Sequence, residues 1–155
     1  MKKQLIRTMT AVVLVLGLFS SAQAENSNQS AIRALLQTYE QVLNAGDVSG
    51  VLRLYTRDGV FMAPHNPSAV GIHAIKTAYE SVFKAIDLDV KFDIAEIKVI
   101  AGNWAFARTY SAGTTTINAT GEKVAEGNQE LFVLQRAGDG QWKIARYSFS
   151  TTNPR

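Results

Sequence analysis

Two expected strands near the C-terminus carry the side chains best suited to acid–base or ligand-binding chemistry. Asn128 and Glu130 are two residues apart on one of them, so their side chains share one face of that strand. A carboxyl group can transfer a proton, and an amide can orient a ligand through hydrogen bonds. We therefore take Glu130 as a candidate catalytic and ligand-binding residue, and Asn128 as a candidate ligand contact.

The preceding strand brings Arg108 and Tyr110 close to Glu130 if the loop between the strands has three residues, 119–121, with Gly121 in the left-handed conformation. Tyr110 then lies opposite Glu130, and Arg108 is the diagonal neighbour of Glu130 on the same face. A guanidinium at that distance lowers the pKa of a carboxyl group, whereas a proton donor at neutral pH needs a raised pKa. We therefore expect Glu130 to be ionised and paired with Arg108, with Tyr110 as a further ligand contact. A two-residue loop would instead place Arg108 and Glu130 on opposite faces.

His65 is the second candidate catalytic residue. It lies in the loop Pro64-His65-Asn66-Pro67, and the pKa of a free imidazole, about 6.5, suits proton transfer at neutral pH. The other histidine, His73, stands near the start of an expected helix, where we expect it to face solvent.

The sequence offers no pattern for a metal or a cofactor. It has two histidines and no cysteine, and it contains no His-x-x-x-His pair and no cluster of carboxylates. No glycine-rich phosphate loop or dinucleotide fingerprint follows an expected strand, and no Gly-x-Ser-x-Gly elbow occurs. We expect neither a metal site nor a cofactor.

The elements that must position the candidates begin with residues 31–64. Apolar residues at helical spacing predict a first helix, and they are Ile32, Leu35, Leu36, Tyr39, Val42 and Leu43. Gly46 can close that helix and Asp47 can cap a second one, which residues 48–55 continue. Residues 56–59, Thr-Arg-Asp-Gly, predict a turn into a short strand at 60–62.

The remaining residues predict a third helix and a run of strands. Apolar residues at helical spacing follow Gly71 up to Ile86, and alternation begins near Val90 with a change of phase that indicates a bulge at Ala95-Glu96. Further strands are expected at 104–117, 122–135 and 141–151, separated by turn residues. Three helices followed by hairpin-linked strands predict an α+β fold, with the helices packed on one face of an antiparallel sheet.

The motif Tyr-x-x-x-Leu-Asn-Ala-Gly-Asp at residues 39–47, the following Asp-Gly and the proline-containing loop resemble the nuclear transport factor-like superfamily. Within it, the chain is most similar to the SnoaL-like and ketosteroid-isomerase-like proteins of the SgcJ/EcaC type, over residues 31–155. The resemblance implies a curved sheet wrapped around helices, a cone-shaped, cystatin-like roll with a pocket at its open end. It also implies a homodimer, because the resembling proteins usually pair through their sheets.

The resemblance assigns roles to three positions. Tyr39, the third candidate catalytic residue, falls where ketosteroid isomerases have a hydrogen-bond-donating tyrosine, and Glu130 falls where they have a protonated acid. Ala63 falls where they have the aspartate that moves the proton. Alanine cannot accept a proton, so we do not expect isomerase chemistry by the family mechanism. Tyr39 also lies on the apolar stripe of its helix, where it could equally be a core residue with a satisfied hydroxyl.

Residues 1–24 have the layout of a secretory signal peptide. Lys2, Lys3 and Arg7 precede a short apolar run at 11–19, and Ala22-Gln23-Ala24 predicts cleavage after Ala24. The polar residues 25–30 are expected to be a disordered lead-in. Of the 16 basic and 13 acidic residues, three basic ones lie before Glu25 and no acidic one does, so the mature chain is neutral. We therefore expect a periplasmic or secreted protein that binds neither nucleic acid nor, after cleavage, a membrane.

These observations favour an exported domain that binds a small, partly apolar ligand through Tyr39, Arg108, Tyr110, Asn128 and Glu130. An alternative is an enzyme, an isomerase, cyclase or dehydratase that acts on a carbonyl compound, with His65 or Glu130 as its base. A second alternative is a homo-oligomeric assembly domain whose pocket is vestigial.

Overall fold

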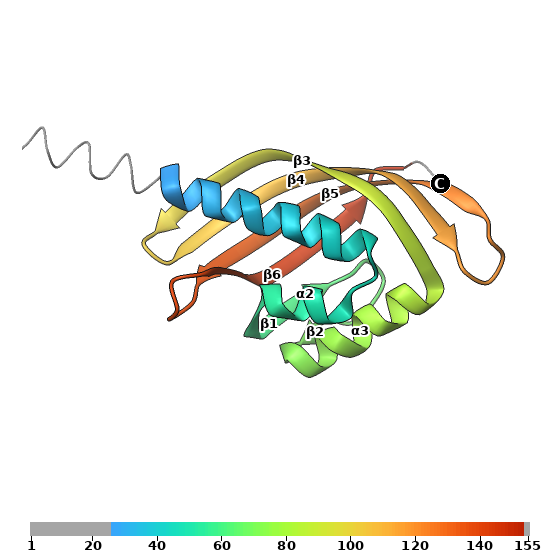
Figure 1. Ribbon diagram of the computed structural model, residues 1–155, viewed down its shortest axis with the longest axis horizontal. Helices are drawn as coiled ribbons and strands as arrows, with labels where there is room; N and C mark the ends of the chain where they lie inside the picture. Colours follow the sequence, from blue (N-terminus) through green and yellow to red (C-terminus); the bar gives the residue numbers. More distant parts are fainter. Residues whose placement is uncertain (1–25, 154–155) are drawn as a thin grey trace, which may run out of the picture.

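The computed structural model describes residues 26–153 and consists of a curved six-stranded sheet covered by helices (Figure 1). The described helices are residues 26–44, α2 (Val48–Leu54) and α3 (Gly71–Ala85). The strands are β1 (Tyr55–Met62), β2 (Ala69–Val70), β3 (Ile86–Ala101), β4 (Trp104–Ile117), β5 (Lys123–Arg136) and β6 (Trp142–Thr151). Residues 1–24, where the signal peptide is predicted, lie outside the described part. Within that part, no helix has the length and apolar character needed to cross a bilayer.

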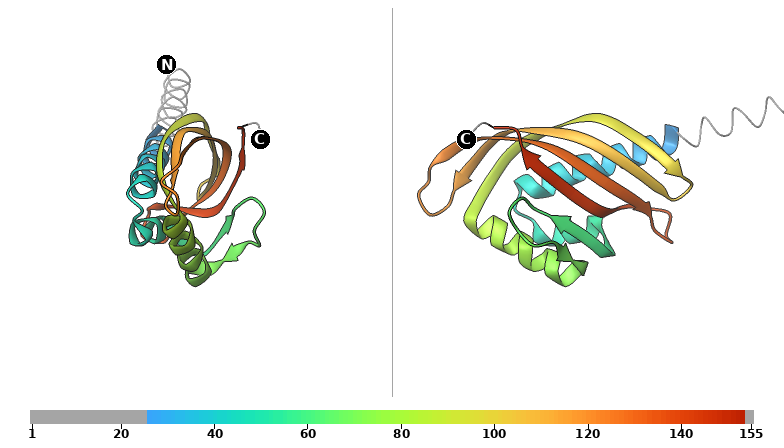
Figure 2. Two further views of the ribbon diagram at one scale, coloured as in Figure 1. Left: turned by 90° about the vertical axis from the view of Figure 1, so that its right-hand side faces the viewer. Right: turned by 180° about the vertical axis from the view of Figure 1, so that it is seen from behind.

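The strand order is β2-β1-β6-β5-β4-β3, with antiparallel neighbours except for the parallel pair β1 and β6. The long strands β3, β4 and β5 curl over the helix at 26–44 (Figure 2). Gly113 permits a close approach at this bend, since a Cβ there would lie 2.0 Å from the carbonyl oxygen of Asp89 on β3. The predicted α+β fold is confirmed.

The helix at 26–44 is tied to β3, the edge strand, by two polar side chains. Asn44 donates to the carbonyl oxygen of Val90 at 2.8 Å and accepts from its amide at 3.0 Å. One turn earlier, a carboxylate oxygen of Glu40 accepts from the amide of Phe92 at 2.8 Å. These bonds use backbone groups that an edge strand leaves unpaired, and they fix the helix along the inner face of the sheet.

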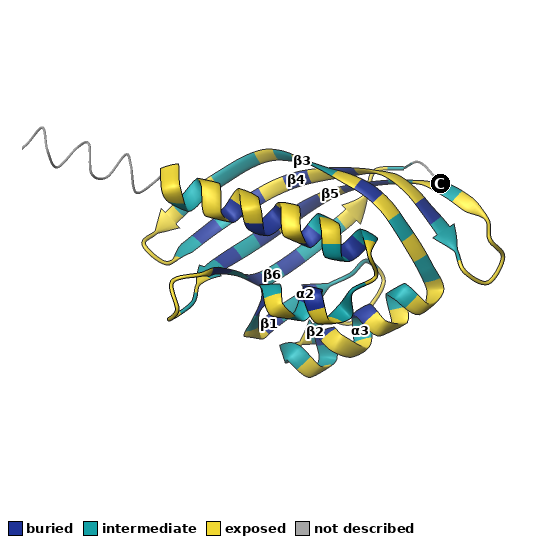
Figure 3. Ribbon diagram, viewed as in Figure 1, coloured by how far each residue is buried: buried dark blue, intermediate teal, exposed yellow. Residues whose placement is uncertain are grey.

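The core lies between that helix and the inner face of the sheet (Figure 3). Ile32, Leu36 and Tyr39 are fully buried on the helix, as the apolar stripe predicted, and Phe132 and Ile144 are fully buried on β5 and β6. The predicted caps are also present. Gly46 has φ +62°, and the side chain of Asp47 accepts from the amide of Gly50 at 2.8 Å.

Two local expectations differ from the structure. Residues 26–30 are helical rather than disordered, because a packed helix extends into polar residues at little cost, and Asn28 accepts from Trp142 Nε1 at 3.4 Å. The segment 56–59 is not a turn but part of β1. There the register against β6 shifts between Tyr55 and Val60, so that the extra residues form an irregularity within the strand. The bulge expected near Ala95-Glu96 is confirmed as a register shift between Ile94 and Glu96.

The expected pairing between β4 and β5 is wrong by one residue. Ile117 and Glu122 close the hairpin, so the loop has four residues, 118–121, instead of three. Gly121 does adopt the left-handed conformation, with φ +73°. The longer loop pairs Thr109 with Glu130 and Arg108 with Leu131. Since side chains alternate between faces, Arg108 and Tyr110 lie on the outer face of the sheet and Glu130 lies on the inner face.

Candidate functional site

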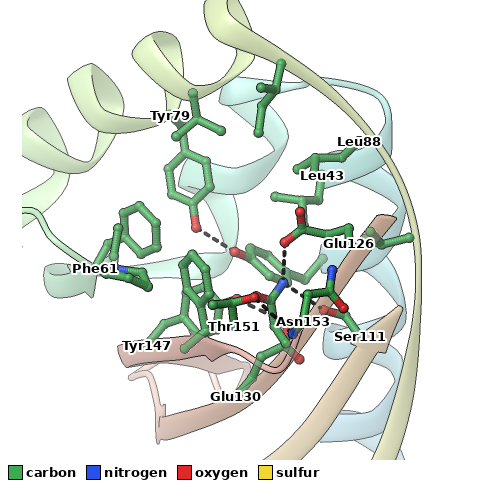
Figure 4. A pocket seen from close by; sticks show the side chains of 18 of the residues that line it. Leu43, Phe61, Tyr79, Leu88, Ser111, Glu126, Glu130, Tyr147, Thr151 and Asn153 are labelled. Atoms are coloured by element: carbon green, nitrogen blue, oxygen red, sulfur yellow. Dashed lines mark hydrogen bonds between the residues drawn. The ribbon is translucent and has the colours of Figure 1, made fainter. Parts of the chain in front are cut away.

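A cavity of about 460 Å³ opens between the inner face of the sheet, α3 and the end of the helix at 26–44 (Figure 4). Its lining comes from that helix, α3, β1, the loop after β1, and β3 to β6. Aromatic rings form one wall, carboxyl and amide side chains form another, and the hydroxyl of Tyr147 joins the two by donating to Glu130. Phe61, Tyr79 and Tyr147 stand together, and Glu126, Ser111 and Asn153 stand across the hollow from them.

The aromatic wall is a stack of rings centred on Phe61. Its ring centroid lies 4.7 Å from that of Tyr79, 5.6 Å from that of Tyr147 and 6.3 Å from that of Phe149, with nearly parallel planes. These rings come from β1, α3 and β6, and all four residues line the cavity. Such a wall offers a flat apolar surface to a ligand.

The polar wall consists of alternate residues of β5, Glu126, Asn128 and Glu130, which point to the same face. The amide nitrogen of Asn128 donates to Glu126 Oε1 at 2.7 Å and to Ser111 Oγ at 3.4 Å. Thr115 donates to the other oxygen of Glu126 at 2.9 Å. Asn128 is 8% exposed, and its side-chain oxygen is buried without a hydrogen-bond partner.

Glu130 is buried among hydroxyl groups. Thr109 on β4 and Tyr147 on β6 donate to its two carboxyl oxygens, the second at 3.4 Å. Burial raises the pKa of Glu130 above its ordinary value of 4.5. Hydrogen bonds from Thr109, Ser111 and Tyr147 oppose this rise, and the nearby charge of Glu126 adds to it. The net direction is toward the protonated acid.

Tyr39 belongs to a chain of buried hydroxyl groups. Its hydroxyl lies 2.5 Å from that of Tyr79, which lies 3.1 Å from that of Tyr55. Burial raises the pKa of each of these tyrosines, and that of Tyr147, well above 10.0. All four therefore keep their protons at neutral pH, and they can donate hydrogen bonds but not act as bases.

A model of the SnoaL-like domain family matches residues 35–147, most of the chain. The chain belongs to this family. Among curated proteins, none matches the chain in sequence.

Solved structures extend the comparison. A ketosteroid isomerase-like protein from Erwinia carotovora atroseptica is 37% identical over 81% of this chain and 96% of its own, with a TM-score of 0.78. An NTF2-like superfamily protein from Salmonella enterica is 16% identical over 83% of this chain and 94% of its own, with a TM-score of 0.73. A putative scytalone dehydratase from Novosphingobium aromaticivorans is 19% identical over 82% and 85%, with a TM-score of 0.72. The last two show the shared fold alone.

In this SnoaL-like domain, three of the predicted site residues meet in one cavity, namely Tyr39, Asn128 and Glu130. Ala63, where the resemblance places the isomerase base, also lines it. His65 is exposed and is not among the lining residues, although Pro64 and Asn66 on either side are.

The structure does not bring Arg108 or Tyr110 into the cavity. Arg108 donates through Nε to Glu96 Oε2 at 2.8 Å on the outer face of the sheet, and this bond raises the pKa of its guanidinium. Tyr110 is 45% exposed on the same face. The expected ion pair between Arg108 and Glu130 is therefore wrong, and so is the lowered pKa that followed from it.

Sequence reasoning missed Glu126, Tyr79 and Tyr147 as parts of the site. Alternation along β5 could have found Glu126, which shares the face of Asn128 and Glu130, but the two tyrosines read as ordinary packing residues. No basic side chain is among the described residues that line the cavity. Within residues 26–153, no group of three or more metal-binding side chains is gathered in one place.

Proposed function

We propose that this SnoaL-like domain binds a small, partly apolar molecule in its cavity and lacks the base of the isomerases. The observation that carries the proposal is the division of the cavity into an aromatic wall and a polar wall. A cavity of about 460 Å³ is in the range of small-molecule sites, which combine apolar lining with a few fixed polar groups. The ring stack would hold the apolar part, and Asn128 and Glu130 would contact the polar part.

Ala63 supports binding over isomerisation. It lines the cavity where the resemblance places a proton-accepting aspartate, and a methyl group cannot take a proton. Tyr39, Tyr79 and Tyr147 hold their protons far above neutral pH, so they do not replace the base.

A second candidate function is acid–base catalysis on a carbonyl compound, as in an isomerase, cyclase or dehydratase. Its support is Glu130, a buried carboxyl group with a raised pKa in a cavity, which is a common property of catalytic acids. Glu130 would donate a proton or hydrogen bond to the carbonyl oxygen. Glu126, the other carboxyl group on the polar wall, would then be the candidate proton acceptor.

Export and dimerisation are further parts of the proposal. The signal-peptide pattern of residues 1–24 supports a periplasmic or secreted protein. Tyr110 and Leu131, each 45% exposed on the outer face of the sheet, support pairing of two copies through that face. The mass of the protein recovered from the producing cell tests export, because cleavage after Ala24 removes residues 1–24. Light scattering of the purified protein tests dimerisation.

The most informative experiment on function is native mass spectrometry of the protein purified from its own compartment. We expect a retained small molecule whose loss accompanies loss of thermal stability, and hits when a metabolite library is screened by thermal shift. The Glu130→Gln variant separates the two candidates, because it should abolish turnover by an enzyme but leave a binder able to bind. No retained molecule and no hits, with a dimer insensitive to changes at Tyr39 and Glu130, would favour an assembly role instead.

A further inference from the structure

We propose that the polar wall of the cavity recognises a cationic hydrogen-bond donor, the ammonium group of a small arylalkyl amine. This inference rests on the proposed binding function and names the class of its ligand. Three independent features of the cavity support it: an unpaired acceptor, two carboxyl groups without a cation, and a ring wall.

The unpaired acceptor is the side-chain oxygen of Asn128. The residue is 8% exposed, it lines the cavity, and its oxygen has no hydrogen-bond partner. The orientation of the amide is set by Glu126, which accepts from its nitrogen at 2.7 Å. A flipped amide would bring two acceptors together. Because buried acceptors are nearly always satisfied, a ligand that donates a hydrogen bond completes this site.

The second feature is charge. Glu126 and Glu130 flank Asn128 on the strand, and the described lining contains no arginine, lysine or histidine to balance them. Arg108 is the basic residue of β4, the strand that pairs with β5, but it lies on the outer face and is bonded to Glu96. An uncompensated carboxyl group in a cavity is costly. An ammonium ion would balance a carboxylate here and would favour the ionised form of Glu130 over its protonated form. It would also donate up to three hydrogen bonds, whereas a carboxylate or phosphate ligand would be repelled.

The third feature decides between an organic and an inorganic cation. The stacked rings of Phe61, Tyr79 and Tyr147 face the polar wall. A ring of the ligand can pack against them, and a cation close to their faces gains a further electrostatic attraction. A hydrated metal ion would leave this apolar surface exposed to water. The cavity is therefore matched to an amine that carries an aromatic or similarly flat apolar group.

Three ligands that share a phenylethyl group test the inference by isothermal titration calorimetry on the purified full chain: 2-phenylethylamine, 2-phenylethanol and 3-phenylpropionate. We expect the amine to bind about tenfold more tightly than the alcohol, because it forms a charge-assisted hydrogen bond where the alcohol forms a neutral one. The acid should bind most weakly. Equal or tighter binding of the acid would overturn the inference. So would displacement of the amine by Mg²⁺ or K⁺ at millimolar concentration, because the site would then take inorganic cations.

A charge-neutral variant ties the preference to the polar wall. Glu126→Gln keeps the size and the acceptor oxygen but removes the charge, so the amine-to-alcohol affinity ratio should fall about tenfold while alcohol binding persists. Glu122→Gln makes the same change on an exposed residue outside the lining and should leave the ratio unchanged. A ratio that survives Glu126→Gln contradicts the inference. Library hits confined to neutral or anionic molecules refute it alone, whereas no hits of any class also refute the proposed binding function.

Discussion

Arg108 and Glu130 leave the sheet on opposite faces. Thr109, not Arg108 or Tyr110, is the partner of Glu130 in the register, and its hydroxyl donates to the Glu130 carboxyl group. Arg108 is bonded to Glu96 on the outer face. The buried acid of the cavity is therefore surrounded by hydroxyl groups and has no positive partner among the described lining residues.

The first prediction concerns Arg108. Replacing it with alanine removes a solvent-exposed ion pair and no contact of the cavity, so ligand retention should not change and the melting temperature should move little. Native mass spectrometry and thermal unfolding measure the two effects. The matched comparison is Glu130→Gln, which alters the cavity itself. A loss of retained ligand in Arg108→Ala alone would mean that the outer face takes part in binding.

The second prediction is the pH dependence of stability. The folded pKa of Glu130 is raised above 4.5, so the folded state holds this proton more tightly than the unfolded state does. The associated stability is fully present below pH 4.5 and is lost as the pH rises through the folded pKa. Each unit of difference between the two pKa values corresponds to about 1.4 kcal/mol. Glu130→Gln cannot lose the proton, so it should gain stability relative to the wild type between pH 4.5 and neutral pH.

Urea unfolding of both proteins across this range measures the difference. The groups that face Glu130 are Thr109 and Ser111 from β4, Glu126 from β5 and Tyr147 from β6. Of these, only Glu126 carries a second carboxyl group, and its charge adds to the raised pKa of Glu130. Glu126→Gln therefore provides the control and should reduce the effect without removing it. A constant difference between Glu130→Gln and the wild type at every pH would refute the raised pKa.

The third prediction concerns the buried tyrosine chain. Tyr79→Phe removes the hydroxyl between those of Tyr39 and Tyr55 and leaves the ring stack in place. Buried hydroxyls that lose a partner cost about 1–3 kcal/mol, so the free energy of unfolding should fall by that amount. Tyr110→Phe, the same change on the outer face, should have almost no effect. Equal stability of the two variants would show that the buried hydroxyl bonds of Tyr39, Tyr79 and Tyr55 contribute nothing to the stability of the fold.

Much of the fold followed from periodicity and caps. Tertiary packing reinforces the local preferences of three features: the apolar stripe that includes Ile32 and Leu36, the left-handed Gly46, and the cap at Asp47. The segment 56–59 misled because Asp-Gly is a turn signal, whereas here the parallel pairing of β1 with β6 absorbs it as an irregularity. A pairing between residues so distant in the chain leaves no short-range pattern to detect.

The candidate site was harder to predict from the sequence than the fold, because its composition depends on the length of the loop between β4 and β5. Gly121 was correctly expected to be left-handed, but three- and four-residue loops both tolerate a glycine there, and the choice moves Arg108 from one face to the other. Tyr39, Asn128 and Glu130 line the cavity. Tyr79 and Tyr147 come from α3 and β6, and only the tertiary fold brings them into the cavity with Glu130.

The last prediction tests the missing base directly. Ala63 lines the cavity that holds Tyr39 and Glu130, so Ala63→Asp should place a proton acceptor in the same cavity as two hydrogen-bond donors. On a β,γ-unsaturated ketosteroid, the new carboxylate could take a proton from the carbon beside the carbonyl and return it to the far end of the double bond. We expect weak activity: the rate should rise over the background rate by no more than about 100-fold, the lower end of what a positioned general base contributes. It would be seen as growth of the conjugated enone absorbance.

Ala63→Asn matches the new side chain in size but cannot accept the proton, so it should stay at the background rate. Combining Ala63→Asp with Glu130→Gln should reduce the gain, because the amide is a weaker donor to the developing oxyanion than a protonated acid. Activity at the same level in the Asn and Asp variants would assign the gain to a change of shape. No gain in Ala63→Asp, with the fold intact, would count against a productive place for residue 63 in the pocket.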